Sequence, residues 1–543
     1  MTANASSSSP AASGSGPAVD LVAAGLLPPL PTAFLEGRDL ELLEPLAFAA
    51  NARQPLTAPP VDRSGLAAAL REANASYGHP DATRAASLLA DPATLVVVTG
   101  QQPGLFGGPL YALSKAVAAS LWAETLTAAG LPAVAVFWIA TEDHDWREST
   151  RAVFETPAGL LHLDLGEDPS PLTPLGMRML GPAVEEALAS LREALPGERA
   201  AAWLDRLADR YRPASRFGEA FARLLVDLLG ERCPLLLDAM LPAVKEAERP
   251  WLERLIDRRA AVDGALAAAD RRITAAGHPL QVEPQPGVAP LFVLHGSERR
   301  RIEWRGEGRW RSRGAEGEPR PVAELLETLA ENPGVVSPGV LARPLVQDAI
   351  LGTALQLLGP GELSYLPQLA PLYDLLEVAP PSLALRPQLL VLERHRRDKL
   401  AELPLALADF VAAELDLDRA LAGGEAEEVV GPARRRIEEA LGELRTRAAA
   451  LDPDLEGPWH KTRGQIEKSL GIFTGKVTGA LGRRHEVARR RAEDLRETCR
   501  PEGAMQERVL SASHFPARHG DAFVDALFEQ VDLDPRCLQV VTP

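Results

Sequence analysis

The sequence predicts an α/β protein built on a parallel sheet and extended towards its C-terminal end by a long helical hairpin. Two apolar runs rich in β-branched residues, at 94–99 and 131–140, flank a segment of helical composition at 110–129. A strand, a turn, a helix and a second strand form a βαβ unit, whose strands pair in parallel. The hairpin is predicted from apolar residues that recur every three or four positions beyond residue 430.

The turn between the first strand and its helix reads TGQQPGLFGGPLYALSK, residues 99–115. We expect Gly108 to cap the helix and Pro109 to be its first residue, since the fixed φ of proline suits that position. Further strands are predicted at 234–238, 290–296 and 301–304, and residues 170–275 are predicted to be mostly helical. A helix is expected from Pro344 to about Leu358, ending at the glycines of GPG.

The hairpin prediction depends on two runs of apolar residues separated by the turn at Asp452 and Pro453. These residues are Ile437, Leu441, Leu444, Ala448 and Leu451, then Ile466, Leu470, Phe473 and Val477. Spacings of four and three between charged faces are typical of an antiparallel helical hairpin or coiled coil. An exposed stripe would suit a second subunit, and a hairpin packed only on its own chain is the alternative.

These patterns divide the chain into four parts. Residues 1–20 form a disordered tail, 21–385 a core with the helical insertion at 170–275, 386–500 the coiled coil, and 501–543 a segment that returns to the core. The tail is rich in serine and alanine and lacks a basic segment followed by an apolar one, so we do not expect a signal peptide.

Composition excludes several classes of protein. The net charge of −17 and the pI of about 5.2 argue against a general binder of nucleic acid or anionic membranes. The three cysteines lie far apart, which favours reduced thiols. No run of about 18 apolar residues predicts a membrane span. We therefore expect a cytoplasmic protein.

The glycines of the first turn, Gly100, Gly104, Gly107 and Gly108, suggest a site for an anion. A helix N-terminus offers free backbone amides, and glycines let a phosphate or carboxylate approach them. Lys115 lies one helical turn further on, where it would add a charge-assisted contact. The alternative is a tight turn in which the glycines serve only the backbone.

Three carboxylates and an imidazole follow the second strand, in Glu142, Asp143, His144 and Asp145. A histidine beside carboxylates can act as a general base while an aspartate holds its orientation. Consecutive residues cannot all face one ion, so no metal ligands are predicted here. The alternative is an acidic cap for the next helix.

Other polar residues are expected to line the same crevice, because ligands of open α/β sheets bind at the carboxyl ends of the strands. Arginine at a helix start is well placed to hold a carboxylate by two bonds. The candidates for substrate binding are Gln101, Gln102, Tyr111, Arg343, Gln347, Asp348, Glu362 and Tyr365.

The motifs resemble those of a known family. TGQQPGLFGGPLY followed by PAVAVFWIATEDHDWRE, then SPGVLARPLVQD with GPGELSYLPQL, and finally MQERVL, resemble the BshC family, the cysteine ligases of bacillithiol synthesis. The order and spacing agree from about residue 25 to 530. The resemblance implies a Rossmann-like core with inserted segments, a coiled coil that makes a homodimer, and the joining of cysteine to the amine of glucosaminyl malate.

A carboxylate and an amine do not condense unaided in water, so the cysteine carboxyl group must be activated. We expect ATP or another activating nucleotide, with Mg²⁺ as a candidate ion. Amides from Gly104 to Gly108 and Lys115 would stabilise phosphate charge, His144 would accept the proton of the amine, and Arg343 would hold a malate carboxylate. The alternatives are a silent nucleotide-binding or scaffolding dimer and a nucleotidyltransferase for another small acid.

Overall fold

The computed structural model describes residues 19–49, 56–306, 308–484 and 486–543, which form two compact units. The first unit consists of Asp20–Val391 and Gln506–Pro543, and the second of Leu392–Met505 together with Val19. The sequence predicts the coiled coil to begin at 386 and the return segment at 501, close to the observed limits of the second unit. The predicted disordered tail lies outside the described residues except for its last two positions, which form strand β1 (Val19–Asp20) instead.

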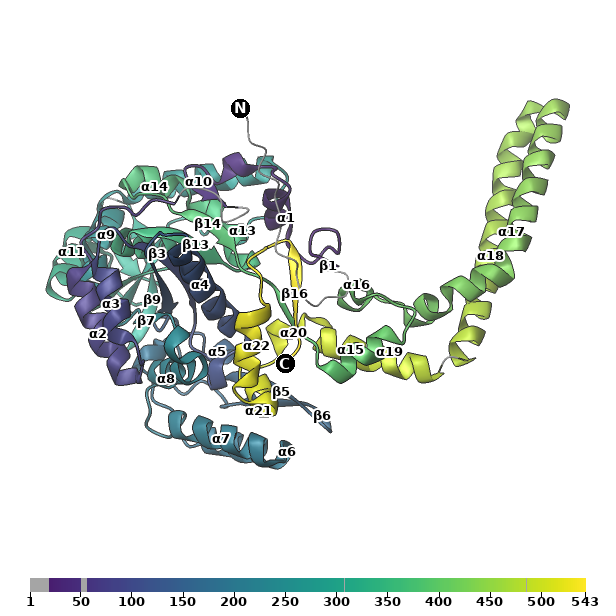
Figure 1. Ribbon diagram of the computed structural model, residues 1–543. Helices are drawn as coiled ribbons and strands as arrows, with labels where there is room; N and C mark the ends of the chain where they lie inside the picture. The colour runs from purple at the N-terminus through teal and green to yellow at the C-terminus, as the bar shows by residue number, and fades with distance from the viewer. Residues whose placement is uncertain (1–18, 50–55, 307, 485) are drawn as a thin grey trace, which may run out of the picture. The chain divides into compact units, whose positions relative to one another are not determined.

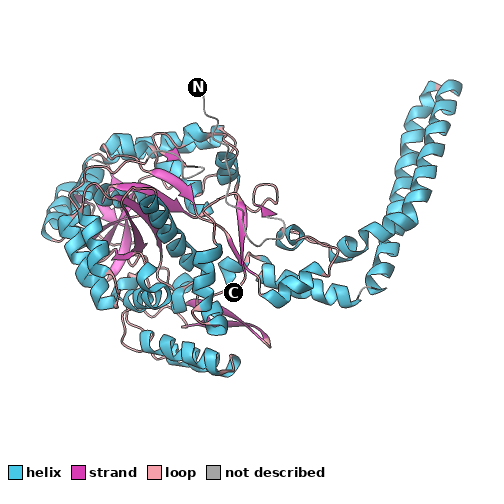
Figure 2. Cartoon of the chain, viewed as in Figure 1, coloured by secondary structure: helices cyan, strands magenta, loops and turns pink. Residues whose placement is uncertain are grey.

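The first unit is built on a six-stranded sheet in which every neighbouring pair is parallel. Its order is β2 (Ala47–Phe48), β14 (Ser382–Leu385), β13 (Thr353–Leu358), β3 (Leu95–Gln101), β4 (Ala133–Ile139) and β7 (Leu235–Asp238). The central strands are buried because helices cover both faces, as their continuous apolar runs predict. The predicted α/β class with a parallel sheet is confirmed (Figure 2).

Helix α4 (Leu110–Ala128) makes the crossover between β3 and β4 and packs on both strands. Its Ala118 and Trp122 join the apolar cluster that contains Val97 and Ala135. Helices α2 (Ser64–Tyr77), α3 (Ala82–Ala90) and α9 (Pro242–Asp257) contribute to a second cluster, which holds the alternate residues of the same strands (Figure 1). Side chains that alternate along a strand thus supply two separate cores.

A second, antiparallel sheet is inserted between β7 and β13. Its order is β11 (Arg320–Pro321), β10 (Arg309–Ser312), β9 (Glu298–Arg305), β8 (Val288–His295) and β12 (Val336–Pro338). The predicted strands at 290–296 and 301–304 are confirmed. The predicted strand at 234–238 is confirmed as β7, an edge strand of the core sheet that lies within the mostly helical segment 170–275.

The remaining elements of this unit complete its surface and edges. Two further strand pairs are β5 (Arg151–Thr156) with β6 (Gly159–Asp164), antiparallel, and β15 (Leu389–Val391) with β16 (Cys537–Val541), parallel. The other helices are α1 (Pro29–Leu35), α5 (Trp146–Ser149), α6 (Ala183–Ala194), α7 (Glu198–Arg210), α8 (Phe217–Leu229), α10 (Arg259–Ala275), α11 (Val322–Glu331), α12 (Arg343–Leu351), α13 (Pro360–Leu369), α14 (Pro371–Leu376), α20 (Gln506–Val509), α21 (His514–His519) and α22 (Ala522–Gln530).

The helix predicted from Pro344 to Leu358 is in fact two elements. Helix α12 ends at Leu351, Gly352 adopts a left-handed φ of +57°, and strand β13 begins at Thr353. The run TALQLL is short and apolar, so its periodicity does not distinguish a helix from a buried strand. Pairing with β3 on one side and β14 on the other decides the strand.

The second unit is helical. It contains α15 (Arg394–Ala401), α16 (Leu407–Val411), α17 (Leu417–Leu451), α18 (Glu456–Arg484) and α19 (Glu486–Cys499), of which α17 and α18 pack together as the predicted hairpin (Figure 1). Ile437, Leu441 and Leu470 face the seam and are at least half-buried, whereas Leu444 and Phe473 are more than half exposed. Within the described residues, no helix is both long and apolar enough to cross a bilayer.

The change Gly352→Ala tests how α12 is separated from β13. An added Cβ would lie 3.1 Å from the carbonyl oxygen of Pro59 at a φ that favours glycine, so we expect destabilisation by about 1–3 kcal/mol. The control is Gly264→Ala in α10, where a Cβ meets open space and alanine favours the helix. Chemical denaturation measures both; equal stability of the two variants would contradict the strain at Gly352.

Candidate functional site

A cleft of about 950 Å³ lies at the carboxyl ends of β3, β4 and β13. Strands β3 and β4 end in register, with Gln101 opposite Ile139, and Gln102 Nε2 just beyond donates a hydrogen bond to Asp143 Oδ2. The two segments singled out in the sequence therefore meet, as the βαβ pattern predicts. The predicted site residues that line the cleft are Gly100, Gln101, Gln102, Tyr111, Lys115, Asp143, His144, Arg343, Glu362 and Tyr365.

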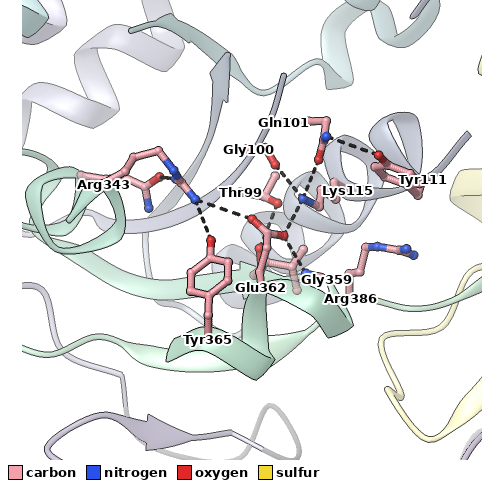
Figure 3. A network of polar contacts seen from close by, with 12 residues as sticks. Thr99, Gly100, Gln101, Tyr111, Lys115, Arg343, Gly359, Glu362, Tyr365 and Arg386 are labelled. Atoms are coloured by element: carbon pink, nitrogen blue, oxygen red, sulfur yellow. Dashed lines mark hydrogen bonds and ion pairs between the residues drawn. The ribbon is translucent and has the colours of Figure 1, made fainter. Parts of the chain in front are cut away.

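Lys115 lies at the centre of a polar network on the floor of the cleft (Figure 3). Its Nζ donates to the carbonyl oxygen of Gly100 at 2.8 Å and to Gln101 Oε1 at 3.0 Å, and it pairs with Glu362 Oε2 at 2.5 Å. These three partners use all three donors of the ammonium group. Lys115 therefore orients Gln101 and Glu362 in this structure, rather than presenting a free charge to a ligand.

Glu362 joins the lysine to two other elements. Its Oε2 accepts the backbone N–H of Gly359 at 2.8 Å, which caps α13, and its Oε1 lies 3.7 Å from Arg343 Nη2. Burial favours the neutral acid, but the charges of Lys115 and Arg343 outweigh it and lower the pKa of Glu362. Glu362 is thus a carboxylate that occupies the helix N-terminus, where an external anion would otherwise bind.

Arg343 is positioned by Gln347, which in turn bonds to Asp348; neither of these two residues lines the cleft. Its Nη1 donates to Gln347 Oε1 at 2.9 Å, and Gln347 Nε2 donates to Asp348 Oδ1 at 3.3 Å. Asp348 also accepts a hydrogen bond of 2.6 Å from Tyr373, and burial raises its pKa to about 6. The structure places Gln347 and Asp348 as supports for Arg343, not as residues that would contact a substrate.

His144 lines the cleft from the turn that follows β4. Its backbone N–H donates to Asp143 Oδ1 at 2.6 Å, and its Nδ1 lies 4.0 Å from that oxygen. Nδ1 is buried and has no hydrogen-bond partner among the described residues. Burial and the charge of Arg299 lower the pKa of His144, so the ring is neutral at neutral pH and able to accept a proton.

Asp145 does not line the cleft. Its Oδ1 accepts the backbone N–H of Glu148 at 2.9 Å and caps the short helix α5. The alternative of an acidic cap therefore holds for Asp145, while Asp143 organises the turn that carries His144.

Arg299, on β9, was not predicted from the sequence. Its side chain donates to Ser337 Oγ at 2.9 Å and to the carbonyl oxygen of Pro338 at 2.8 Å, and its guanidinium stacks 3.8 Å from the centre of the Phe292 ring. Burial lowers its pKa to about 10, so it stays charged at neutral pH. The inserted antiparallel sheet thus brings a fixed positive charge to the wall that holds His144.

The glycine turn does not form the predicted anion cradle. Gly104, Gly107 and Gly108 are buried and lie outside the cleft lining. The N–H of Gly107 donates to Gly104 O at 3.2 Å and to Tyr211 Oη at 3.1 Å, and the N–H of Gly108 donates to Leu105 O at 3.0 Å. Since these amides already have partners, a phosphate group does not fit this turn.

Close packing explains the glycines. A Cβ at Gly104 would lie 2.5 Å from the Cα of Gly108, and one at Gly100 would lie 2.7 Å from the carbonyl oxygen of Trp138. The start of the helix also differs from the prediction: Pro109 caps α4 and Leu110 is its first residue. The structural alternative given for this turn is the correct one for Gly104 and Gly108.

Sequence reasoning missed several other residues of the lining. They are Glu148, Asp263, Asp270, Phe292, Arg299, Arg301, Arg386 and Arg508. Arg508 belongs to the MQERVL segment already noted, but nothing in the spacing assigns it to the cleft. Glu142, predicted beside Asp143 at the strand end, does line the cleft. Three or more acidic, histidine or cysteine residues arranged to hold a metal ion do not occur among the described residues.

A parallel sheet with helices on both faces and a polar cleft at the carboxyl ends of its strands defines a Rossmann-like protein with a small-molecule site. The chain belongs to the BshC family of bacillithiol biosynthesis. The model of the family's N-terminal Rossmann-like domain matches residues 44–387, and that of its C-terminal coiled-coil domain matches residues 389–535. The resemblance noted in the sequence is confirmed.

Similar proteins occur in several bacteria. A candidate cysteine ligase BshC of Solibacter usitatus is 31% identical over 480 residues, covering 88% of each chain. The corresponding proteins of Salinibacter ruber and Thermus thermophilus are 29% and 32% identical, over 89% and 78% of this chain and 89% and 84% of their own. The similarity therefore spans both domains.

The environment of His144 predicts a measurable shift in its pKa. We expect a value below the ordinary 6.5, because burial and the charge of Arg299 disfavour the imidazolium ion. The change Arg299→Gln removes that charge and should raise the pKa of His144. Titration of ¹³C-labelled histidine by NMR, assigned with a His144→Gln spectrum, measures both values. A pKa above 6.5 in the unchanged protein would show that burial and the charge of Arg299 do not control the protonation of His144.

Proposed function

We propose that the protein joins the carboxyl group of cysteine to the amine of glucosaminyl malate and forms an amide bond. The observation that carries this proposal is His144, a neutral imidazole with a buried, unpartnered Nδ1 in the wall of a cleft lined by several cationic side chains. A neutral base suits removal of a proton from an attacking amine, and cations suit the carboxylates of the two substrates. The relatives' name, cysteine ligase BshC, supports the ligase part of this proposal.

The reaction requires an activated cysteine. The amine nitrogen attacks the carbonyl carbon, the activating group leaves with the carbon–oxygen electron pair, and the proton of the amine passes to His144. ATP or another nucleotide would supply the activating group, with Mg²⁺ as a candidate ion. The glycine turn is not assigned to its phosphates, because the amides of Gly107 and Gly108 are already bonded.

The other residues of the cleft position the reactants. Asp143 holds the turn that carries His144, and Lys115 fixes Gln101 and Glu362. Gln102 and Tyr365 offer hydrogen-bonding groups to the sugar. Arg343 adds positive charge to the cleft, although Gln347 and Tyr365 already accept hydrogen bonds from its guanidinium.

We further propose a cytoplasmic homodimer formed through the α17–α18 hairpin. The hairpin exposes Leu444, Leu451, Ile472 and Phe473, each more than half accessible. A concentration of exposed apolar residues on a long helical hairpin is typical of an interface. The three cysteines are unpaired, as expected for a reducing compartment.

Incubation of the protein with glucosaminyl malate, cysteine and ATP, followed by mass spectrometry, tests the reaction. The thiol product is expected, and the accompanying AMP or ADP identifies the kind of activation. If no product forms with any nucleotide or cysteine carrier, the proposal is wrong and the scaffold alternative gains support.

The change His144→Gln should lower kcat/KM by about 10²–10⁴-fold, the usual contribution of a general base. Its matched control is Asp145→Asn, outside the cleft, which should keep most of the activity. In the unchanged protein the base is active when neutral, so activity should fall as the pH drops through the lowered pKa of His144. Full activity of the glutamine variant would rule out the base role.

The change Phe473→Glu should shift the protein from dimer to monomer, because it places a charge on the exposed apolar surface of α18. Gln465→Glu, an exposed position on the same helix, adds the same charge and should leave the dimer intact. Sedimentation velocity measures both. A monomeric unchanged protein, or a dimer insensitive to the charge at 473, would contradict this interface.

A further inference from the structure

The cations of the cleft differ in how many of their donors are already used by protein atoms. Lys115 has three acceptors, and Arg343 is shared among Gln347, Tyr365 and Glu362. Arg299 donates to Ser337 and Pro338. These three side chains set the shape and charge of the cleft but have little capacity left for a substrate.

Arg508 is different. It lies on α20 in the C-terminal return segment, lines the cleft, is exposed, and makes no hydrogen bond or ion pair within the part of the chain that the structure describes. Burial raises the pKa of Tyr111 to about 12, and the positive charges of Arg386 and Arg508 reduce that rise. The geometry agrees: α20 packs against α4, the N–H of Leu110 donates to the carbonyl oxygen of Leu510 at 2.8 Å, and Glu507 beside Arg508 pairs with Arg386. Arg508 therefore belongs to the same corner as Tyr111 and Arg386.

Arg386 forms the back of this corner. It follows β14, is 2% exposed, and lies 5.6 Å from the centre of the Tyr111 ring. In Figure 3, Arg386 and Arg343 lie on either side of Lys115 and Glu362. The Nε of Arg386 is buried and has no hydrogen-bond partner among the described residues, and a Cβ at Gly359 would be in van der Waals contact with it, at 3.8 Å.

Glu507 fixes Arg386 and ties the corner to α20. Its Oε2 and Oε1 accept from Arg386 Nη1 at 2.9 Å and from Nη2 at 2.7 Å, and Oε2 also accepts the backbone N–H of Leu389 at 2.8 Å. This buried, two-pronged pair balances the charge of Arg386. The net positive charge of the corner therefore comes from the adjacent residue, Arg508.

We propose that this corner, made by Tyr111, Arg386 and Arg508, is the subsite for the malate dicarboxylate of the acceptor, and that Arg508 determines specificity for it. The proposal rests on the proposed function, because it names where that acceptor binds. Two adjacent carboxylates fit a free guanidinium backed by an unpartnered N–H, and an acceptor without carboxylates would leave Arg508 unpaired. Glu507 is a positioning residue, since it acts through Arg386.

The test compares two acceptors in the full-length protein, glucosaminyl malate and methyl glucosaminide, which lacks the carboxylates. Calorimetry gives the affinity of each for the unchanged protein and for Arg508→Gln, Arg508→Lys and Arg301→Gln. The last variant is the matched control, since Arg301 also lines the cleft and has no hydrogen bond or ion pair from its side chain within the described residues. Arg508 is exposed, so its replacement should leave folding intact.

We expect Arg508→Gln to lower the affinity for glucosaminyl malate by about tenfold or more and to leave the affinity for methyl glucosaminide unchanged. Arg508→Lys should recover part of the lost affinity. Arg301→Gln should leave the ratio of the two affinities unchanged. Equal effects of Arg508→Gln on both acceptors, or no effect, would overturn the subsite even if ligation occurs.

Free L-malate separates this proposal from the proposed function. If malate binds in a manner that depends on Arg508 but no ligation occurs, the subsite stands and the reaction is wrong. If glucosaminyl malate is ligated and Arg508→Gln leaves its affinity unchanged, the reaction stands and the subsite is wrong. Failure of the unchanged protein to bind either dicarboxylate would overturn both.

Discussion

The parallel pairing of β3 with β4 is the constraint on which the site depends. The two strands run in register from Leu95 and Ala133 to Gln101 and Ile139, so the segments that follow them leave the sheet at the same edge. Gly100 permits this approach, since a side chain there would meet the backbone of Trp138. The bond from Gln102 to Asp143 follows from that register and fixes the turn that carries His144.

Charge in the cleft is arranged around buried pairs. Lys115 with Glu362 joins α4 to α13, and Arg386 with Glu507 joins the end of β14 to α20, so each pair connects elements that are distant in sequence. Taking such ions out of water costs free energy, and the attraction within each pair offsets that cost only when the geometry is good. Pairs of this kind contribute little to stability, but they fix where each charge lies. The cleft can therefore keep an unpartnered imidazole and a free guanidinium at defined positions.

The glycine turn shows that one sequence feature can have two physical explanations. Glycines before a helix suit a phosphate, and they equally suit a backbone that must pack against itself. In this protein the space beside Gly104 is filled by Gly108, and the Tyr211 hydroxyl group bonds to the turn. At the cleft, the N-terminus of α13 holds an anion, and that anion is Glu362 of the same chain.

The sequence by itself determined the local features of this protein. Apolar runs predicted β3, β4 and β7, the crossover helix α4 and the hairpin of α17 and α18, because each depends on the periodicity of neighbouring residues. It also placed Asp143 and His144 at a strand end beside Gln102. The short run at 353–358 was assigned to a helix, since only its neighbours in the sheet distinguish it as a strand.

Tertiary structure alone decided which of these residues face the cleft. Gln347 and Asp348 lie behind Arg343, and Gly104 is sealed inside, although their residue types suit a ligand. Arg299, Arg386 and Arg508 reach the cleft from an inserted sheet, a later strand and the C-terminal segment. The position of Arg386 depends on its contact with Glu507, more than a hundred residues further along the chain. The spacing of residues in a single sequence does not predict such contacts.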